Sequence, residues 1–391
     1  MDRRKVDVVI LGAGTAGMAA YRSAVRAGAN ALLVDPGPLG TTCARSGCMP
    51  SKLLLAGSRR AAEARAQAQG AVGGEIAVGD AAVLDDVRRG RDGFVDGVLA
   101  ELRDLARGRL LLGRARLAGT TTLVVEPSAA SSPPTAPGEP VQSPLEVEAR
   151  AVVVATGTRA IVPKALQALG DRLYTEESIF ELHRPPPSMA VVGGGAIGLE
   201  LGQAFARLGT RVLVVESEPR LSVVSDHAVE EALRGALRRE LDLRVGAQVT
   251  AAHREGDRAV LTLRHDDGTL HDERVDAVLV AAGRRPRIDG MGLEELGLPL
   301  ERGAPRVDPL TLQWGDAPVF FAGDVTQQHP VLHEAATDGD VAGRNAARYP
   351  HLDARPRRTA LSIVFTEPTV AIVGPRWSEL ARRPLVAGSA S

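Results

Sequence analysis

The only two cysteines of this 391-residue chain, Cys43 and Cys48, lie five positions apart in the stretch GTTCARSGCMPSK. Two thiols can form and break a disulfide when their Cα atoms lie within about 7 Å, which a short turn into a helix permits. A structural zinc site usually needs four ligands, and no further cysteine or histidine follows at zinc-finger spacing. We therefore expect redox chemistry and no metal site. The alternative is two unrelated buried thiols.

A pattern of three glycines, G-x-G-x-x-G, occurs twice, each time between a strand-like and a helix-like stretch, in VILGAGTAG and AVVGGGAIG. The first glycine of such a turn makes the bend, the second lets backbone approach a pyrophosphate at the helix N-terminus, and the third lets the helix pack on the strand. The pattern predicts two dinucleotide sites, and the alternative is two βαβ units without a ligand. The glycines are Gly12, Gly14 and Gly17 in the first copy and Gly193, Gly195 and Gly198 in the second.

An acidic residue ends the next predicted strand in both copies. Asp35 and Glu216 each follow the first glycine by 23 positions. A carboxylate at this place accepts hydrogen bonds from a free ribose 2′-hydroxyl and repels a 2′-phosphate, so Glu216 favours NAD over NADP. Arg220, four residues further on, would weaken that preference.

Composition and charge narrow the class of protein. Hydrophobic residues make up 44% of the chain and charged residues 24%, with a net charge of −1. This balance gives no basic field for nucleic acid and no polybasic signal for membranes. No apolar run reaches the ~18 residues that span a bilayer. The N-terminus runs directly into a strand-like segment without a signal peptide, so we expect a cytoplasmic protein. The many glycines and few aromatic residues favour an α/β fold.

Other predicted strands end in small residues, and Asp324 follows one of them, at the carboxyl end where α/β folds bind ligands. A low-complexity stretch from Ser128 to Pro140 predicts a loop. The predicted strands are 123–126, 145–148, 151–155, 275–284, 319–322, 360–365 and 370–373, and a helix is predicted over 332–347.

The order of these motifs resembles the pyridine nucleotide–disulfide oxidoreductases, and most closely their dihydrolipoyl dehydrogenase branch, from about residue 5 to about residue 380. The shared motifs include Cys-x4-Cys-x-Pro-Ser-Lys, Ala-Thr-Gly, Ala-Gly-Arg-x-Pro and Ala-Gly-Asp. The resemblance implies two Rossmann-like domains, the NAD domain inserted in the FAD domain. The expected boundaries are 1–160 and 286–352 for the FAD domain, 161–285 for the NAD domain, and 353–391 for the remnant of a dimerisation domain.

The resemblance also implies which residues hold the cofactors. FAD would be held by Gly12, Gly14, Gly17, Asp35, Thr42, Lys52, Thr156, Gly157 and Asp324. NAD would be held by Gly193, Gly195, Gly198, Glu216 and Gly283.

The same resemblance assigns roles in a reaction of dihydrolipoamide with NAD⁺ that gives lipoamide and NADH. Cys43 would exchange with the dithiol, and Cys48 would face the flavin. Lys52, one helical turn further, would lie near the flavin and pair with Glu200, although a lone lysine in a leucine-rich stretch is more often a surface residue. The partner would be dihydrolipoamide or a lipoyl domain of a 2-oxoacid dehydrogenase-type complex, and the family forms homodimers.

Family members carry a further domain that forms the dimer interface and supplies a His-Glu acid–base pair, whereas this chain stops at Ser391. Strands 360–365 and 370–373 would begin that domain, with apolar faces that lack partners. His329 and His333 are possible substitute bases, but a helix-start and packing role is favoured. The alternatives are a diaphorase-like or non-catalytic flavoprotein, or a mercuric or small-disulfide reductase. A mercuric reductase usually has an extra cysteine pair, and glutathione-type reductases use NADPH.

Overall fold

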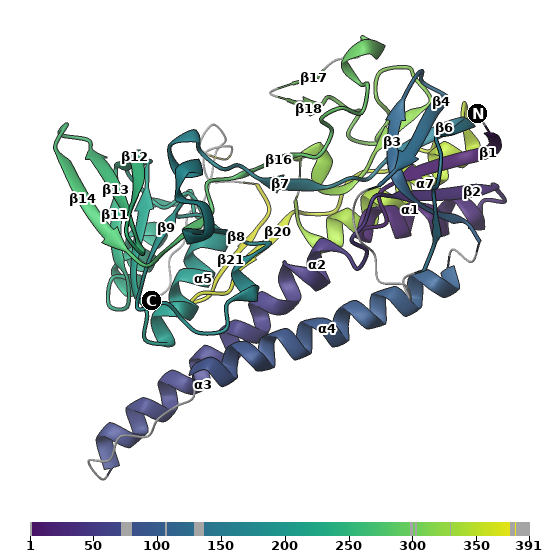
Figure 1. Cartoon of the computed structure of the whole chain (residues 1–391). Helices are drawn as coiled ribbons and strands as arrows, with labels where there is room; N and C mark the ends of the chain where they lie inside the picture. The colour runs from purple at the N-terminus through teal and green to yellow at the C-terminus, as the bar shows by residue number, and fades with distance from the viewer. Residues whose placement is uncertain are drawn as a thin grey trace. The chain divides into compact units, whose positions relative to one another are not determined.

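The computed structural model describes residues 2–71, 80–105, 108–128, 137–297, 300–301, 303–328, 330–375 and 380. The chain forms two compact units, each made of three separate stretches (Figure 1). The first unit contains residues 1–45, 91–159 and 284–358, and the second contains residues 46–90, 160–283 and 359–391.

A largely parallel sheet forms the centre of the first unit. Its hydrogen-bonded order is β1-β2-β3-β4-β6-β19, β1 also pairs with β6, and β5 pairs with β3. Leu11, Val34, Val154 and Phe321 lie level in the register, so the strands end along one edge. The strands are β1 Asp2–Leu11, β2 Ala31–Asp35, β3 Leu110–Leu117, β4 Thr122–Pro127, β5 Glu139–Pro140, β6 Leu145–Val154 and β19 Val319–Phe321.

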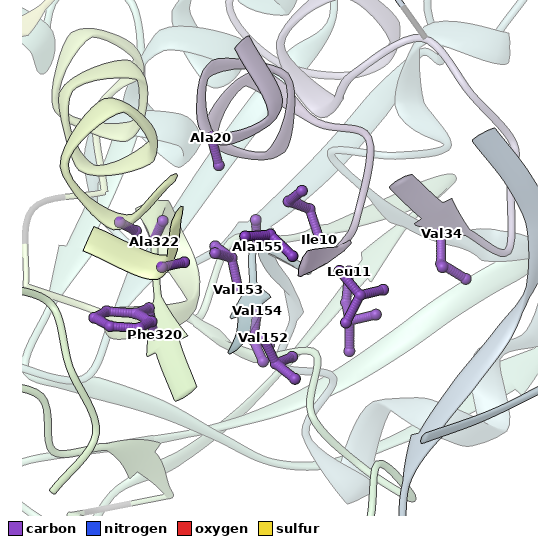
Figure 2. Close-up of a cluster of buried hydrophobic side chains, with 14 of the residues drawn as sticks. Ile10, Leu11, Ala20, Val34, Val152, Val153, Val154, Ala155, Phe320 and Ala322 are labelled. Atoms are coloured by element: carbon purple, nitrogen blue, oxygen red, sulfur yellow. The ribbon is translucent and has the colours of Figure 1, made fainter. Parts of the chain in front are cut away.

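Apolar side chains of these strands form the core that holds the sheet edge in place. Figure 2 shows Ile10 and Leu11 of β1 beside Val152–Ala155 and Phe320. Strands that are buried on both faces have continuous apolar runs in their sequences. The ends of β1 and β6 both have such runs.

Helices α1 (Thr15–Arg26) and α7 (Leu332–Arg348) cross at very short range in the same unit. A Cβ on Gly339 would lie 2.2 Å from the Ala16 carbonyl oxygen, and one on Gly343 would lie 2.1 Å from that of Ala20. Small residues four apart on both helices therefore allow the backbones to touch. Further elements of this unit include α2 Thr42–Arg45, β16 Arg284–Pro286, β17 Leu300–Glu301 and β18 Ala304–Pro305, with β7 Thr158–Ala160 at its boundary.

The second unit contains a parallel sheet in the order β11-β10-β9-β15-β8. Val192, Val215 and Val280 lie level at its carboxyl edge. The strands are β8 Leu173–Thr175, β9 Ser188–Val192, β10 Arg211–Glu216, β11 Asp242–Val245 and β15 Ala277–Val280. An antiparallel sheet is formed by β12 Ala247–Glu255, β13 Arg258–His265 and β14 Leu270–Val275, and the helices include α5 Ala196–Arg207 and α6 His227–Leu237.

Helix α3 (Cys48–Ala71) packs against α5 in this unit. Helix α4 (Asp80–Leu105) follows it, and Gly57 of α3 receives the side chain of Val83. A hairpin of β20 (Leu361–Val364) and β21 (Val370–Val373) completes the described part of the unit.

The structure corrects three details of the sequence analysis. The predicted strands 145–148 and 151–155 form one continuous strand, β6. Residues 46–90 pack in the second unit, not with the rest of 1–160, because α3 lies on α5. The predicted hairpin forms, but its apolar faces are not all unpartnered, since Val364 and Val370 join a buried cluster with Phe205 of α5. The predicted loop's residues 129–136 lie outside the described residues. None of the described helices is long and apolar enough to cross a membrane.

The helix crossing predicts that Gly343→Ala lowers the free energy of unfolding by about 1–3 kcal/mol, because the added methyl forces the α1 and α7 backbones apart. Gly235→Ala is the matched control, since Gly235 lies in α6 and a Cβ there would meet no described atom within 4 Å. That control should be neutral or stabilising by up to ~1 kcal/mol. Urea unfolding of both variants measures the difference, and equal effects would contradict the close crossing.

Candidate dinucleotide and redox site

The first glycine turn connects β1 to α1, and its three glycines have different surroundings. Gly12 has φ +104°, and a Cβ there would lie 2.5 Å from the Ala155 carbonyl oxygen. A Cβ on Gly17 would lie 1.7 Å from the carbonyl oxygen of Gly12. At Gly14, a Cβ would meet nothing within 4 Å in the described part of the chain. The first and third glycines are thus required by packing, and the second leaves open space at the helix start.

The second turn, between β9 and α5, repeats this arrangement. Gly193 has φ +115°, and its Cβ would lie 2.3 Å from the Ala281 carbonyl oxygen. A Cβ on Gly198 would lie 2.1 Å from the Gly193 carbonyl oxygen, whereas one on Gly195 would meet no described atom within 4 Å. The internal repeat predicted from the sequence is therefore also a repeat of geometry.

The strand-end acids bind the two turns through equivalent atoms. Asp35 accepts hydrogen bonds from the backbone N–H of Ala13 at 2.7 Å and of Gly37 at 2.7 Å. Glu216 accepts from the backbone N–H of Gly194 at 2.8 Å and of Glu218 at 2.9 Å. In each copy the donors are the residue between the first two glycines and the residue two positions after the acid.

Burial raises the pKa of Asp35, while the N–H groups of Ala13 and Gly37 and the charge of Arg287 act in the opposite direction. The Asp35 carboxylate is therefore held by donors in a site that disfavours its charge.

The surroundings of the turns fit a dinucleotide. The N-terminal residues Gly14 of α1 and Gly195 of α5 supply no side-chain cap, and neither helix has an acidic residue in its first turn. The backbone N–H groups there suit an anionic phosphate. Beyond β6, the buried Oγ1 of Thr156 finds no hydrogen-bond partner among the described residues, as expected of an atom that a ligand would satisfy. Gly157 follows it with φ +67°.

Asp324 lies in a 3-10 turn after β19, near the charge of Arg284, a residue to which no role was predicted. Burial raises the pKa of Asp324, and the positive charge of Arg284 opposes this. Burial likewise lowers the pKa of Arg284, against the charge of Asp324. Arg284 also donates to Oγ1 and to the carbonyl oxygen of Thr158, each at 2.8 Å. The Ala-Gly-Arg-x-Pro motif contains Arg284 and could have indicated this position.

The two cysteines lie on consecutive helices, Cys43 on the short α2 and Cys48 on the long α3. Thr42 begins α2 and is exposed, and Cys43 follows it half-buried. Cys48 is exposed at the first residue of the 24-residue helix α3. A thiolate there is stabilised by the partial positive charge of the helix N-terminus, and the first turn holds no acidic residue.

Lys52 and Glu200 form the predicted pair in the second unit. Nζ of Lys52 lies 2.6 Å from Oε2 of Glu200, whose side chain is 8% exposed. A carboxylate this buried needs a charged or hydrogen-bonding partner. Lys52 thus supplies that partner, while its own side chain stays 37% exposed. Gly283, predicted to hold NAD, follows β15 with φ +100°, and its carbonyl oxygen accepts from the N–H of Ile161 at 3.0 Å.

The two histidines that could replace a missing base gain little support. His333 is the second residue of α7, as expected of a helix-start residue, but its side chain is 55% exposed and so has no packing role. Its Nε2 lies 3.7 Å from the Glu334 carboxylate. His329 lies outside the described residues.

Each of the two glycine turns is hydrogen-bonded to a strand-end carboxylate, and this arrangement defines a protein that binds two dinucleotides. The model of the family described as pyridine nucleotide-disulphide oxidoreductase matches residues 6–339, and the chain therefore belongs to this family. Members use FAD and NAD(H), which confirms the predicted cofactors. The predicted fold class is confirmed as well.

Curated relatives differ in the reaction that their names state. The chain is 30% identical to dihydrolipoyl dehydrogenase of Thermus scotoductus over 95% of its own length and 75% of the relative's. It is 34% identical to mercuric reductase of Streptomyces lividans over 94% of its length and 75% of that protein. Among solved structures, LpdA of Mycobacterium tuberculosis matches with a TM-score of 0.79 and 25% identity, covering 97% of this chain and 80% of that one.

The raised pKa of Asp35 predicts that FAD binding weakens in acid. Protonation removes the carboxylate that ribose hydroxyls need, and the loss begins at higher pH than the ordinary value of 3.8 would give. Asp35→Asn should bind FAD about 10–100-fold more weakly near neutral pH, since its amide group cannot accept from both backbone donors. The pH-dependent loss of FAD binding should be smaller in this variant, because its amide group does not titrate. Flavin fluorescence titrations measure both, and parallel pH curves would contradict the prediction.

Proposed function

We propose that this chain is an FAD-dependent dithiol–disulfide oxidoreductase of the dihydrolipoyl dehydrogenase type, which oxidises dihydrolipoamide with NAD⁺. The observation that carries the proposal is the placement of Cys48 and Lys52 one turn apart on α3, with Lys52 bonded to the buried Glu200. Two nucleotide turns alone fit many oxidoreductases, whereas a cysteine and an ion-paired lysine on one helix fit dithiol chemistry beside a flavin.

The cysteine pair exchanges bonds with the substrate. A substrate thiolate attacks Sγ of Cys43 in the Cys43–Cys48 disulfide, so that a substrate–Cys43 bond forms and Cys48 leaves as a thiolate. The second substrate thiol, once deprotonated, then attacks the substrate sulfur of that mixed disulfide. Cyclic disulfide product leaves, and Cys43 takes up a proton. Two electrons thereby pass from the substrate to the cysteine pair.

The remaining residues hold the cofactors and the charge. When bound, FAD supplies the two-electron exchange between the cysteine pair and the nicotinamide. Asp35, Thr42, Thr156, Gly157 and Asp324 would hold it. The N-terminus of α3 stabilises the Cys48 thiolate, and Lys52 keeps a positive charge fixed one turn away.

The second candidate is a metal-ion reductase, which the 34% identity to a mercuric reductase favours. The same cysteine pair would bind the thiophilic ion as thiolates. A diaphorase-like flavoprotein remains the alternative if the cysteines exchange with no dithiol. The proposed setting is cytoplasmic, with dihydrolipoamide or a lipoyl domain of a 2-oxoacid dehydrogenase-type complex as partner.

An assay of the FAD-loaded chain separates these functions. We expect NAD⁺ reduction by dihydrolipoamide, lost to background in Cys43→Ser, while NADH oxidation by ferricyanide persists in that variant because it needs no disulfide. Ser46→Ala, between the cysteines, is the matched control and should retain both activities. Mercuric ion is tested as acceptor in parallel. Activity with the dye alone would support the diaphorase-like alternative, and NADPH- or NADH-dependent loss of mercuric ion would support the second candidate.

The Glu216 carboxylate predicts a preference for NADH over NADPH of at least about 10-fold in kcat/KM, because it repels a 2′-phosphate. Glu216→Gln should narrow this ratio, since the amide oxygen can still accept from one backbone N–H but the negative charge is gone. The ferricyanide assay with both nucleotides measures the ratio. An unchanged ratio in the variant would show that selection lies elsewhere, with Arg220 as the next residue to replace.

A further inference from the structure

The turn between β20 and β21, residues 365–369, contacts the Lys52–Glu200 pair through Phe365. We infer that Phe365 is a positioning residue for Lys52, and that this turn is part of the redox site. The inference rests on the proposed function, which places Lys52 beside the flavin. All residues involved lie in the second compact unit.

Phe365 contacts both members of the ion pair. Nζ of Lys52 lies 4.4 Å from the centroid of the Phe365 ring, within the range of a cation–π interaction. The backbone N–H of Phe365 donates to Oε1 of Glu200 at 2.9 Å, while Oε2 of Glu200 is bonded to Lys52. One residue therefore fixes the carboxylate through its backbone and the ammonium through its ring.

The position of Phe365 is unusual for a residue that serves packing alone. Phe365 is 44% exposed, although the neighbouring Val364 is buried. An aromatic ring left at the surface gains little from burial, so its contact with an ammonium is the main interaction that the described structure gives it.

The turn that carries Phe365 is itself held on α5. Gln203 forms two hydrogen bonds with the backbone of Glu367, accepting from its N–H at 2.7 Å and donating to its carbonyl oxygen at 2.9 Å. Gln203 is fully buried, so these bonds replace water for its amide. Glu200 and Gln203 lie three residues apart on one face of α5, and the turn therefore lies along that face.

Two arginines clamp the Glu367 side chain from different helices. Arg207 of α5 lies 2.6 Å from Oε2 of Glu367, and Arg59 of α3 lies 2.9 Å from Oε1. Arg207 also bonds Glu240, and that hydrogen bond raises the pKa of Arg207. The turn is thus joined to α5, which carries Glu200, and to α3, which carries Lys52.

The chain contains so few lysines that the contact between Lys52 and Phe365 can be measured by NMR. The chain contains three lysines, Lys5, Lys52 and Lys164, among 47 basic residues. The side chain of Lys5 is 79% exposed, and Lys164 is also exposed. Lysine labelled with ¹³C at Cε would therefore give three NMR signals, and Lys52→Arg assigns the one that matters.

The first measurement is the NMR spectrum of the full FAD-loaded chain. We expect the Lys52 CεH₂ protons to be shifted upfield of the other two signals by the ring current of Phe365. The shift should disappear in Phe365→Leu, persist in Phe365→Tyr, and persist in Ile363→Val, an exposed control on β20. Thermal unfolding of the variants checks that each is folded.

The second measurement is NADH oxidation by ferricyanide. Phe365→Leu should lower kcat by about 3- to 10-fold with little change in KM for NADH, and Phe365→Tyr should restore it. The Ile363→Val control should match the native chain.

The outcomes separate this inference from the proposed function. An absent upfield shift in the native chain, or a shift unaffected by Phe365→Leu, would overturn the contact itself. If Phe365→Leu loses the contact without slowing turnover, while Lys52→Arg does slow turnover, the positioning role is overturned. The proposed function then stays intact. If Lys52→Arg also leaves turnover unchanged, the proposed place of Lys52 fails, and the inference fails with it.

Discussion

The close contact between each helix start and the glycine turn before it is the constraint on which this structure depends. At Gly17 and Gly198 the helix backbone lies so close to the preceding turn that no side chain fits, and this closeness aims the first N–H groups at open space. Asp35 and Glu216 then tie the turn to the next strand through backbone donors. Both nucleotide sites therefore consist mainly of backbone held in place, and the side chains needed are those that permit or fix that backbone.

This also explains how much could be predicted from the sequence. The glycines that packing requires and the acids that bind the turns are local features with fixed spacing in the sequence. The two turns, most of the flanking strands and the C-terminal hairpin could therefore be predicted. The placement of α3 in the second unit was not, because it depends on packing against α5, far away in the chain. Arg284 belongs to a recognised motif, but no role was predicted for it. No sequence pattern around Phe365 indicated a role for that residue. Its significance arises only once the hairpin meets Lys52.

The substrate is less determined than the cofactors for the same reason. FAD and NAD(H) are recognised by conformations that a few glycines and acids specify. A dithiol and a thiophilic metal ion can both react with one pair of cysteines, so the choice lies in side chains around the pair. Relatives named for either reaction share about a third of their residues with this chain. The ion pair on α3 and α5 is the part of the redox site that the structure defines most fully.

The division of each unit into three stretches of chain has a consequence for synthesis on the ribosome. Helix α1 needs α7 to cover its close-packed face, and β6 needs β19 at its free edge. Roughly 300 residues separate α1 from α7, and at about 5–20 residues per second their translation takes on the order of 15–60 s. During that interval the strands of the first unit that have already been made lack their last partners. The nascent chain therefore exposes apolar surface, and is prone to aggregation, for much of its synthesis.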